Sequence, residues 1–519
     1  LKEQKKLLKN DKLNHSYPHS WRSKAPLIYR ATPQWFISMQ KNDLRNKAIK
    51  AINNTIFYPN KGKERLLSMV EGRPDWCVSR QRVWGVPLPI FINKKTNEPL
   101  KDKKVIERIA SIYEKQGSDC WFDDDPKVFL GDEHNPDDYQ KLNDIVEVWF
   151  DSGSTHSFVL EKRKDLKWPA DMYLEGSDQH RGWFHSSLLE SCGTRGRAPF
   201  ESILSHGFVV DGKGMKMSKS VGNVISPEDI LKNYGADILR VWVAASDYAE
   251  DLRIDKSILT QHAESYRKIR NTFRFMLGNL KDKYEKQDFE KIDLKEFDEL
   301  EQYILHKIYH ISKSVETNLK NYNFHKLYKE LLNFCTLDLS SFYFDIRKDV
   351  LYCDSLDSKK RINCVKVLNI ILESLLKWFA PILVFTTDEV YSLISKDEKN
   401  IHEQNFAEVP KKWENKELNN KWDHLFKIKQ EANIAIETKR SSKEIGSSLE
   451  AEVKLSVNKK KFELLKNLDL AEYLITSKAE KVLIQDEEMK IEVSKAKGNK
   501  CPRCWKILEK SCSRCSNLI

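Results

Sequence analysis

The sequence predicts an α/β domain, followed by a helical bundle and a small α+β domain with a cysteine cluster. From about residue 46 to 245, short apolar runs end in turns that contain Gly or Asp. From about 246 to 430, apolar residues recur at three- and four-residue spacing, and beyond that they alternate with polar ones. A chain of 519 residues is long enough for three or four domains of roughly 100–200 residues each.

The composition excludes several classes of protein. Hydrophobic residues make up 40% and charged residues 32%, which argues against a disordered or collagen-like chain. No run approaches the roughly 18 apolar residues of a spanning helix, so we expect no membrane partner. Lys plus Arg total 88 against 77 Asp plus Glu, a formal charge of +11. This excess favours a polyanionic partner, although a lysine-rich surface explains it equally well.

In the α/β region, strands are predicted over residues 145–150, 172–174 and 203–210. Each run is apolar and stops at a turn that carries an acidic residue and a glycine. The pattern is typical of buried strands that run into functional loops.

In the helical region, residues 266–280 and 367–378 carry the spacing of amphipathic helices. The second helix should end before Pro381, because proline lacks the amide that a helix interior needs. Thr386 and Glu389 have the spacing of a capping box at the start of the next helix. After the bundle, residues 449–457 and 489–493 alternate as strands do.

Four of the ten cysteines lie close together, in two C-x-x-C pairs separated by seven residues: Cys501, Cys504, Cys512 and Cys515. Such pairs can close a tetrahedral thiolate cage around one Zn²⁺, which leaves no position for water and is therefore structural. The other six cysteines are scattered, which favours a reducing compartment and a cytoplasmic location. Arg503, Lys506 and Arg514 flank the cage and can reach the phosphates of a nucleic acid, or merely keep it soluble.

Residues 211–220 read Asp-Gly-Lys-Gly-Met-Lys-Met-Ser-Lys-Ser, and they place Lys216 and Lys219 three residues apart on a loop rich in glycine. Such a loop can close over a triphosphate and offset the charge that builds on leaving pyrophosphate. It is not a P-loop, and its spacing alone favours an exposed hairpin.

A second polar turn follows the strand predicted over residues 172–174. Glu175 stands at the carboxyl end of the strand, where α/β sheets bind ligands, and Asp178 and Gln179 follow in the turn. Carboxylates there can hold an ammonium group or a ribose hydroxyl, while a turn that only caps a helix explains them equally well.

These segments together carry a resemblance. The run from Lys216 to Ser220 resembles the KMSKS signature of class I aminoacyl-tRNA synthetases. Residues 76–87, 148–154, 173–184 and 206–211, with the Cys-Pro-Arg-Cys-Trp run at 501–505, resemble bacterial-type isoleucyl-tRNA synthetases from about residue 15 to 515.

The resemblance implies the C-terminal half of a class I Rossmann-like catalytic domain, a helical anticodon-binding bundle and a small α+β domain with a zinc knuckle. Its implied domains are the return segment of the editing insertion (1–45), the catalytic second half (46–245), the tRNA-binding bundle (246–430), the small α+β domain (431–497) and the knuckle (498–519). Because the chain holds no His-x-Gly-His, the resemblance implies the C-terminal part of a longer synthetase.

The resemblance assigns roles to individual residues, position by position. Lys219 contacts the phosphates of ATP with help from Lys216, and the loop residues Met217, Ser218 and Ser220 complete the ATP-binding segment. The residues implied to contact the isoleucyl-adenylate are Glu175, Gly176, Asp178 and Gln179. The four clustered cysteines match the ligands of one structural Zn²⁺ per chain, and ATP is expected to enter with Mg²⁺.

The implied activity is isoleucine–tRNA ligation: the carboxylate of isoleucine attacks ATP, pyrophosphate leaves, and the aminoacyl group passes to the terminal ribose of tRNA(Ile). The implied partners are isoleucine, ATP and tRNA(Ile), and a monomer is expected. Valine differs from isoleucine by one methylene, which changes the binding free energy by only about 1–3 kcal/mol, and this family is a known example of that limit on selectivity. Editing of valine is therefore expected in the full-length enzyme. Two alternatives remain open: a valyl-type synthetase, and a tRNA-binding fragment without catalysis.

Overall fold

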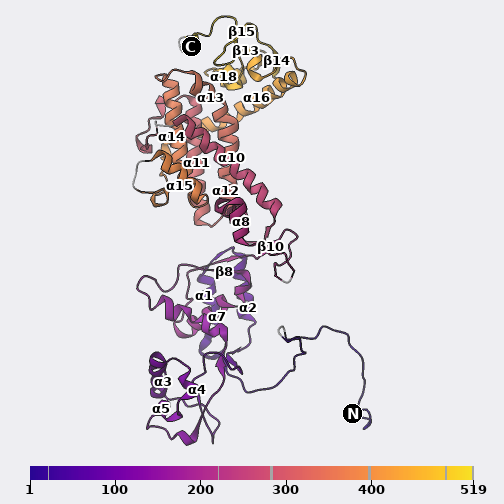
Figure 1. Cartoon of the computed structure of the whole chain (residues 1–519), viewed down its shortest axis with the longest axis vertical. Helices are drawn as coiled ribbons and strands as arrows, with labels where there is room; N and C mark the ends of the chain where they lie inside the picture. Colours follow the sequence, from indigo (N-terminus) through magenta and orange to yellow (C-terminus); the bar gives the residue numbers. More distant parts are fainter. Residues whose placement is uncertain (21–22, 220, 281–283, 396–398, 486–487, 517–519) are drawn as a thin grey trace. The chain divides into compact units, whose positions relative to one another are not determined.

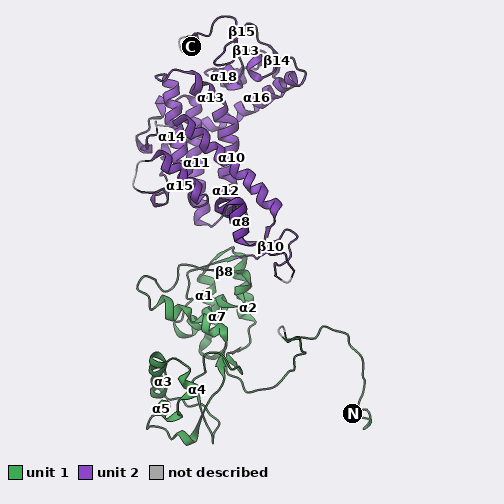
Figure 2. Cartoon of the chain, in the orientation of Figure 1, with its two compact units in different colours: residues 1–205 green, residues 206–519 purple. Residues whose placement is uncertain are grey.

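The structure of the chain is a computed structural model that describes residues 1–20, 23–219, 221–280, 284–395, 399–485 and 488–516. The chain divides into two compact units, Leu1–Ser205 and His206–Ile519, which Figure 2 colours separately. Among the described residues, no helix combines the length and the apolar content that a membrane-spanning segment requires.

Unit 1 is built around a three-stranded sheet in the order β2-β9-β8, in which β2 and β9 run parallel. Its main elements, in chain order, are β1 (Phe36–Ile37), α1 (Leu44–Asn54), β2 (Ile56–Tyr58), α2 (Lys61–Glu71), β3 (Trp76–Cys77), β4 (Ser79–Arg80), β7 (Ile145–Val146), α6 (Val148–Gly153), β8 (Tyr173–Gly176), α7 (Trp183–Thr194) and β9 (Ser202–His206). Helix α7 is buried along most of its length and packs against α1 and α6. It is therefore the central helix of this unit.

A satellite of unit 1 forms its own small core around Trp121, which is fully buried. Its elements are β5 (Phe91–Asn93), α3 (Lys103–Gln116), α4 (Cys120–Asp123), α5 (Pro126–Leu130) and β6 (Tyr139–Lys141), and β5 pairs with β6 in antiparallel fashion. The rings of Phe91 and Phe129 lie against Trp121 with centroids 4.9 and 5.2 Å away.

Unit 2 begins with the parallel pair β10 (Val209–Asp211) and β11 (Leu252–Ile254), joined by α8 (Pro227–Tyr234) and α9 (Ala236–Ala245). A bundle follows, made of α10 (Lys256–Leu280), α11 (Glu299–Lys320), α12 (Phe324–Asn333), the π-helix η8 (Phe334–Tyr343), α13 (Phe344–Cys353), α14 (Lys359–Phe379), α15 (Val384–Ile394) and α16 (Lys416–Ser441). Helices α10, α11 and α14 pack together, as Figure 1 shows, and most of α14 is buried.

After the bundle, β12 (Ala451–Val457) lies at the centre of a sheet, parallel to β13 (Lys478–Leu483) and antiparallel to β14 (Lys490–Lys495). Its alternating side chains enter the core of the bundle, which explains the period of two in the sequence. The short helices α17 (Lys459–Leu464) and α18 (Leu470–Leu474) join β12 to β13. The last elements are β15 (Asn499–Lys500), β16 (Ile507–Leu508) and α19 (Ser513–Ser516).

Several expectations about these elements are confirmed. Both amphipathic helices of the bundle form, within α10 and α14, and α14 ends at Phe379, before Pro381. Both strands expected after the bundle form as β12 and β14.

Three expectations are wrong. The strand predicted over 145–150 ends at Val146, because residues 148–153 form helix α6, which packs on α7. The run 203–210 is two strands in different sheets, β9 and β10. Thr386 caps no helix, because α15 begins at Val384; its hydroxyl donates instead to Asp237 Oδ2, 2.6 Å away.

Candidate functional site

The side chains of Asp211 and Asn223 fix the loop that holds Lys216 and Lys219. Asp211, the last residue of β10, accepts hydrogen bonds from the amides of Lys213 and Met215 through Oδ1, at 3.0 and 2.8 Å. Its Oδ2 accepts from Asn223 Nδ2 at 2.9 Å, and Asn223 Oδ1 accepts from the amide of Ser218 at 2.9 Å. The hydrogen bonds, first among them that from Asn223, lower the pKa of Asp211, so the clamp keeps its charge at neutral pH.

The glycine at the start of the loop is required by close packing. A Cβ at Gly212 would lie 2.1 Å from Asp255 Oδ2, so any larger residue would push the loop away from β11. The loop then runs into α8, where the hydroxyl of Ser226 accepts from the amide of Asp229 at 3.2 Å and Pro227 occupies the first turn.

The lysines on this fixed backbone are exposed. Neither Lys216 nor Lys219 forms an ion pair with the residues that the structure describes, whereas Met217 is half-buried against the small core under the loop. Ser218 is half-buried, and Ser220 lies outside the described residues. The loop thus presents two cationic side chains to solvent on a constrained main chain. Sequence reasoning missed the clamp, although Asp211 and Asn223 both lie within seven residues of the signature.

The second predicted segment lies at the end of β8 in unit 1. Glu175 and Asp178 are exposed, Gly176 is buried, and the amide of Gly176 donates to Glu175 Oε2 at 2.8 Å. Asp178 Oδ2 accepts from Gln179 Nε2 at 3.2 Å. Both carboxylates therefore stand at the carboxyl end of a strand, as predicted, and are open to a ligand.

Gln179 also has a structural role. Its Oε1 accepts from the amide of Trp183 at 3.0 Å and so caps the start of α7. The indole of Trp183 stacks on Tyr173 with a centroid distance of 4.1 Å and donates from Nε1 to Ser152 O at 3.0 Å. These contacts hold the β8–α7 turn against α6, so the turn is both a helix cap and a rigid support for Glu175.

The lysine loop belongs to unit 2 and Glu175 to unit 1. The resemblance implies that the two segments share one nucleotide site, and this stays a prediction.

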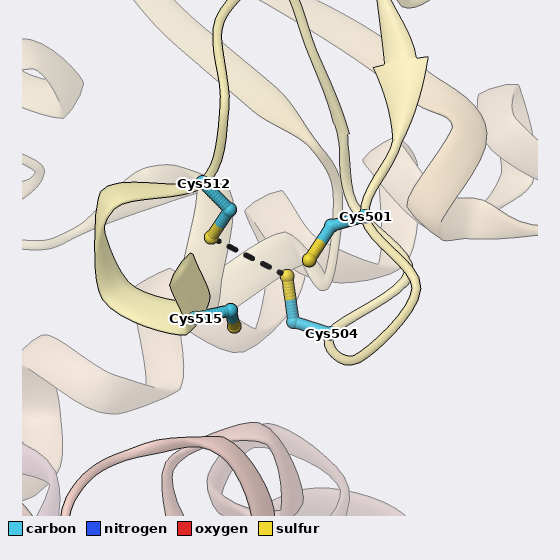
Figure 3. A group of neighbouring side chains, drawn as sticks. All are labelled: Cys501, Cys504, Cys512 and Cys515. Carbon is cyan, nitrogen blue, oxygen red and sulfur yellow. Dashed lines mark hydrogen bonds between the residues drawn. The ribbon is translucent and has the colours of Figure 1, made fainter. Parts of the chain in front are cut away.

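The four cysteines of the terminal cluster converge, as Figure 3 shows. All four Sγ atoms lie within 4.8 Å of one another, and those of Cys504 and Cys512 are 3.9 Å apart. A tetrahedral ion with bonds of about 2.3 Å places its sulfur ligands about 3.8 Å apart, so the spacing fits zinc. Among the described residues, this is the one group of three or more acidic, His or Cys side chains placed to share a metal ion.

The main chain around the cluster is organised by short local elements. The first cysteine pair follows β15, whose hairpin with β16 is extended by the amide of Cys501, which donates to Lys506 O at 2.9 Å. Burial raises the pKa of the Cys501 thiol, but the amides of Cys504 and Arg503 outweigh it and lower the pKa to about 7. A thiol prepared for ionisation in a nearly buried cluster is the donor that a soft divalent cation requires.

The basic residues around the cage do not lie as expected for phosphate contacts. Arg514 forms two hydrogen bonds with Asp349 of α13, Nη1 to Oδ2 at 2.7 Å and Nη2 to Oδ1 at 2.9 Å. Lys506 Nζ lies 3.9 Å from the same carboxylate, and Arg503 Nη2 donates to Tyr352 O at 3.2 Å. The three side chains thus attach the knuckle to the bundle, a pairing that no short-range sequence pattern shows.

Two family models match the chain. The model described as tRNA synthetases class I (I, L, M and V) matches residues 3–255, and the anticodon-binding domain of tRNA ligase matches residues 301–455. The α/β region, the helical bundle and the four-cysteine terminus expected from the sequence are confirmed as a fold class.

Curated relatives match along the whole chain. An isoleucine–tRNA ligase of Pelagibacter ubique is 66% identical over 100% of this chain and 57% of the relative. The isoleucine–tRNA ligases of Gluconobacter oxydans and Zymomonas mobilis are each 45% identical over 99% and 100% of this chain and 54% and 57% of theirs. The chain thus spans little more than half the length of these relatives.

Among solved structures, a methionyl-tRNA synthetase of Mycobacterium tuberculosis in complex with methionyl-adenylate is similar in fold. It has a TM-score of 0.51 and 16% identity, and the match covers 75% of this chain and 69% of that one.

Proposed function

Because the chain belongs to the class I tRNA synthetase family, and within it to the isoleucine–tRNA ligases, we propose that it takes part in the activation of isoleucine by ATP and its transfer to tRNA(Ile). The proposal is carried by the 66% identity to such a ligase along the whole chain. In the first step a carboxylate oxygen of isoleucine bonds to the α-phosphorus of ATP and the bond to pyrophosphate breaks. In the second a ribose hydroxyl of the tRNA terminus attacks the carbonyl carbon and AMP leaves.

In this reaction Lys219, assisted by Lys216, neutralises the charge on the phosphates of ATP. Support comes from the clamp of Asp211 and Asn223, which fixes the loop while both ammonium groups remain without an ion pair among the described residues. A cation held in advance near the leaving group costs little reorganisation when charge develops there.

The isoleucyl-adenylate contacts Glu175, Gly176, Asp178 and Gln179. The two exposed carboxylates at the end of β8 and the buried glycine between them support this role, because a ligand at that edge can approach the main chain closely. ATP enters with Mg²⁺, in keeping with phosphate chemistry.

The regions of the chain have different roles, and one of them binds tRNA. Residues 46–245 supply the second half of the catalytic domain, after a return segment over 1–45, and the bundle over 246–430 holds the anticodon stem. Residues 431–497 form the small α+β domain, and the knuckle over 498–519 holds one structural Zn²⁺. Support for the metal comes from the convergence of Cys501, Cys504, Cys512 and Cys515.

The proposal is tested by amino-acid-dependent exchange of pyrophosphate into ATP, measured on the complete gene product that carries this chain. Lys219→Ala should lower isoleucine-dependent exchange by about 10²–10³-fold, the range for removal of one group that stabilises developing negative charge. The affinity for tRNA should change by less than about twofold, because Lys219 is one exposed lysine among many and contributes little to the total attraction to phosphates.

Lys213→Ala is the matched control, because Lys213 is exposed on the same loop but lies outside the signature. Exchange that depends on valine rather than isoleucine would contradict the amino acid assigned. A Lys219→Ala variant that loses only tRNA affinity would contradict the role of the loop.

A further inference from the structure

Helix α9 of unit 2 belongs to two hydrophobic cores at once. Trp242 packs in the small core under the lysine loop, together with Met217 of that loop. Its neighbour Val241 packs in the core of the bundle, and Ala245, one turn further on, lies against the same core. One helix of ten residues therefore connects the segment that carries the lysine loop to the bundle.

The face of α9 that meets the bundle carries a buried carboxylate. Asp237 is 7% exposed, and it accepts hydrogen bonds from the amides of Phe385 and Thr386 at 3.2 and 2.8 Å. Both amides lie in the first turn of α15, whose own N-cap residue, Leu383, has no side-chain acceptor to offer them. A negative charge at this end also interacts favourably with the helix dipole. Helix α15 therefore takes its N-terminal cap from α9, across 149 residues of sequence.

The next turn of α9 binds the chain that leads into α15. Arg240 donates from Nε to Ile382 O at 3.1 Å and from Nη2 to Pro381 O at 2.6 Å. Both carbonyl groups lie in the connection between α14 and α15. Asp237 and Arg240, which we call the α9 pair, thus bind the amides and the carbonyls of one short segment with opposite charges.

A third helix of the bundle joins this network through Thr386. The hydroxyl of Thr386 lies 2.6 Å from Asp237 Oδ2, and because a carboxylate only accepts, the hydroxyl is the donor. Thr386 Oγ1 then accepts from the hydroxyl of Tyr266 on α10, 2.9 Å away. Thr386 is 5% exposed, so little water competes for these hydrogen bonds. Helices α9, α10 and α15 are therefore held at one carboxylate.

The proposed function gives the chain two small substrates and one large one. Isoleucine and ATP can react without touching the bundle, whereas a tRNA held by the bundle also has to be aligned with the reacting groups. The position of the lysine-loop segment on the bundle is therefore important for the RNA substrate and not for the small ones.

We propose that Asp237 and Arg240 are positioning residues for the transfer step. They hold the lysine-loop segment at one place on the bundle, so that tRNA bound to the bundle is aligned for aminoacyl transfer. This role rests on the proposed function, whereas the hydrogen bonds of the α9 pair are independent of it.

The test compares activation with transfer in the complete gene product that carries this chain. In Asp237→Asn and in Arg240→Ala, isoleucine-dependent pyrophosphate exchange should stay within about twofold of the unmodified protein, while kcat for aminoacylation of tRNA(Ile) should fall about tenfold. A displacement of about 1 Å can cost up to about 100-fold in rate. Arg240 is exposed, so its variant should fold even if the buried Asp237 cannot be replaced.

A truncated RNA separates positioning from general damage to the protein. A hairpin with the acceptor arm of tRNA(Ile) and no anticodon arm is not held by the bundle, so its charging should stay within about twofold in both variants. Thr386→Val should lower kcat for full tRNA about fivefold, and Thr386→Ser, which keeps the hydroxyl, should lower it by less than about twofold. Asp388→Asn and Lys232→Ala, at exposed residues of α15 and α8, are the matched controls.

Three results overturn the proposal: exchange falls as much as transfer, the truncated RNA loses as much as the full tRNA, or transfer in both variants equals that of the controls. Failure of the proposed function differs from all three, because the unmodified protein itself would then show no isoleucine-dependent exchange. Hydrogen exchange tests the α9 pair without any reaction. The amides of Phe385 and Thr386 should exchange at least about tenfold faster in Asp237→Asn, and unchanged protection would show that Asp237 does not hold α15.

Discussion

The two units bury charge in different ways. In unit 2, Arg347 of α13 is 3% exposed, and all its partners are in place: Nε and Nη2 donate to Glu301 at 2.7 and 2.6 Å, and Nη1 donates to Glu472 at 2.8 Å. In unit 1, Glu190 of α7 is 9% exposed, and its Oε1 has no partner among the described residues. A Cβ at Gly153 of α6 would lie only 2.2 Å from that oxygen, so the carboxyl is pressed against the neighbouring helix.

The buried ion pairs of unit 2 support the fold, whereas the buried polar atoms of unit 1 that have no partner among the described residues indicate a site for a ligand or a reaction. The network of Arg347 joins α11, α13 and α18, so it fixes the small domain on the bundle. Several of the unsatisfied buried atoms of unit 1, by contrast, lie in or next to α6 and α7: Glu147 Oε2, His185 Nε2, Glu190 Oε1 and Ser191 Oγ. Buried polar groups without partners are unfavourable for stability, and they are commonly retained where a ligand or a reaction needs them.

The cysteine cluster is the extreme case, because four thiolates so close together would repel one another without a cation between them. Cys501→Ser should lower the metal content from about one zinc ion per chain to less than a tenth, since structural zinc contributes on the order of 10–16 kcal/mol. Metal analysis after dialysis measures this, and proteolysis should then cut residues 498–516 first. Cys77→Ser is the control, because Cys77 belongs to unit 1 and is not one of the four clustered cysteines. Full metal content in Cys501→Ser would contradict the four-thiolate site.

The second largest effect, a loss of free energy of unfolding, is expected when the ion-pair network of Arg347 is broken. Arg347→Met leaves Glu301 buried without a cation, while Glu472 keeps its ion pair with Lys360, and should lower the free energy of unfolding of unit 2 by about 3–5 kcal/mol in urea. Adding Glu301→Leu should recover more than half of this loss, because an apolar pair replaces a buried ion pair at little cost. Arg267→Met, at an exposed residue, is the control. If the double variant is no more stable than the single one, the uncompensated carboxylate is not the cause.

The carboxyl group of Glu190 should destabilise unit 1 when it ionises, whereas the ion pairs of Arg347 stabilise unit 2. Burial, and then Asp151 and Glu147, raise the pKa of Glu190 to about 9. The unfolded chain releases this proton near pH 4.5 and the folded chain only near 9, so the stability of unit 1 falls as the pH rises between these values. Glu190→Gln should therefore raise the free energy of unfolding at pH 8 by about 2 kcal/mol.

Urea unfolding at pH 5 and pH 8 measures the effect of Glu190→Gln. The gain should be much smaller at pH 5, because this pH is close to the pKa of the carboxyl in the unfolded chain, which then gains little by releasing the proton. Glu201→Gln is the control, at an exposed carboxylate on the same unit. An equal gain at both pH values would show that the proton of Glu190 does not contribute.

The ion pair between Arg514 and Asp349 lies between these extremes, because its side chains are 31% and 22% exposed. Asp349→Asn should loosen the knuckle by about 0.5–1 kcal/mol, the range for partly exposed pairs. Hydrogen exchange of the amides of 513–516 should become two- to fivefold faster, while the metal content stays the same. Asp388→Asn, at an exposed residue of α15, is the control. Loss of metal would show that the pair supports the cage rather than its attachment.

Sequence reasoning succeeded where a signal lies within a few residues. Pro381 ended α14, and the alternation over residues 451–457 became β12, because both effects act on the local main chain. It failed over 145–150, where apolar residues with no clear period formed α6 because of their packing on α7. For the candidate site, it predicted the lysines, the acidic turn and the cysteines, of which the structure brings the four cysteines together, and it missed the clamp on the lysine loop.

By itself, the sequence determined the resemblance to class I synthetases, the order of an α/β region, a bundle and a cysteine knuckle, and the four residues that converge in that knuckle. Cysteine pairs and lysine signatures are readable because their members are neighbours along the chain. Only the tertiary structure decided that Arg347 meets Glu301 and Glu472, 46 and 125 residues away, and that Arg73 meets His185 across 112 residues. Such pairings follow from how helices and strands pack, and packing depends on the shape and charge of the whole core rather than on spacing along the chain.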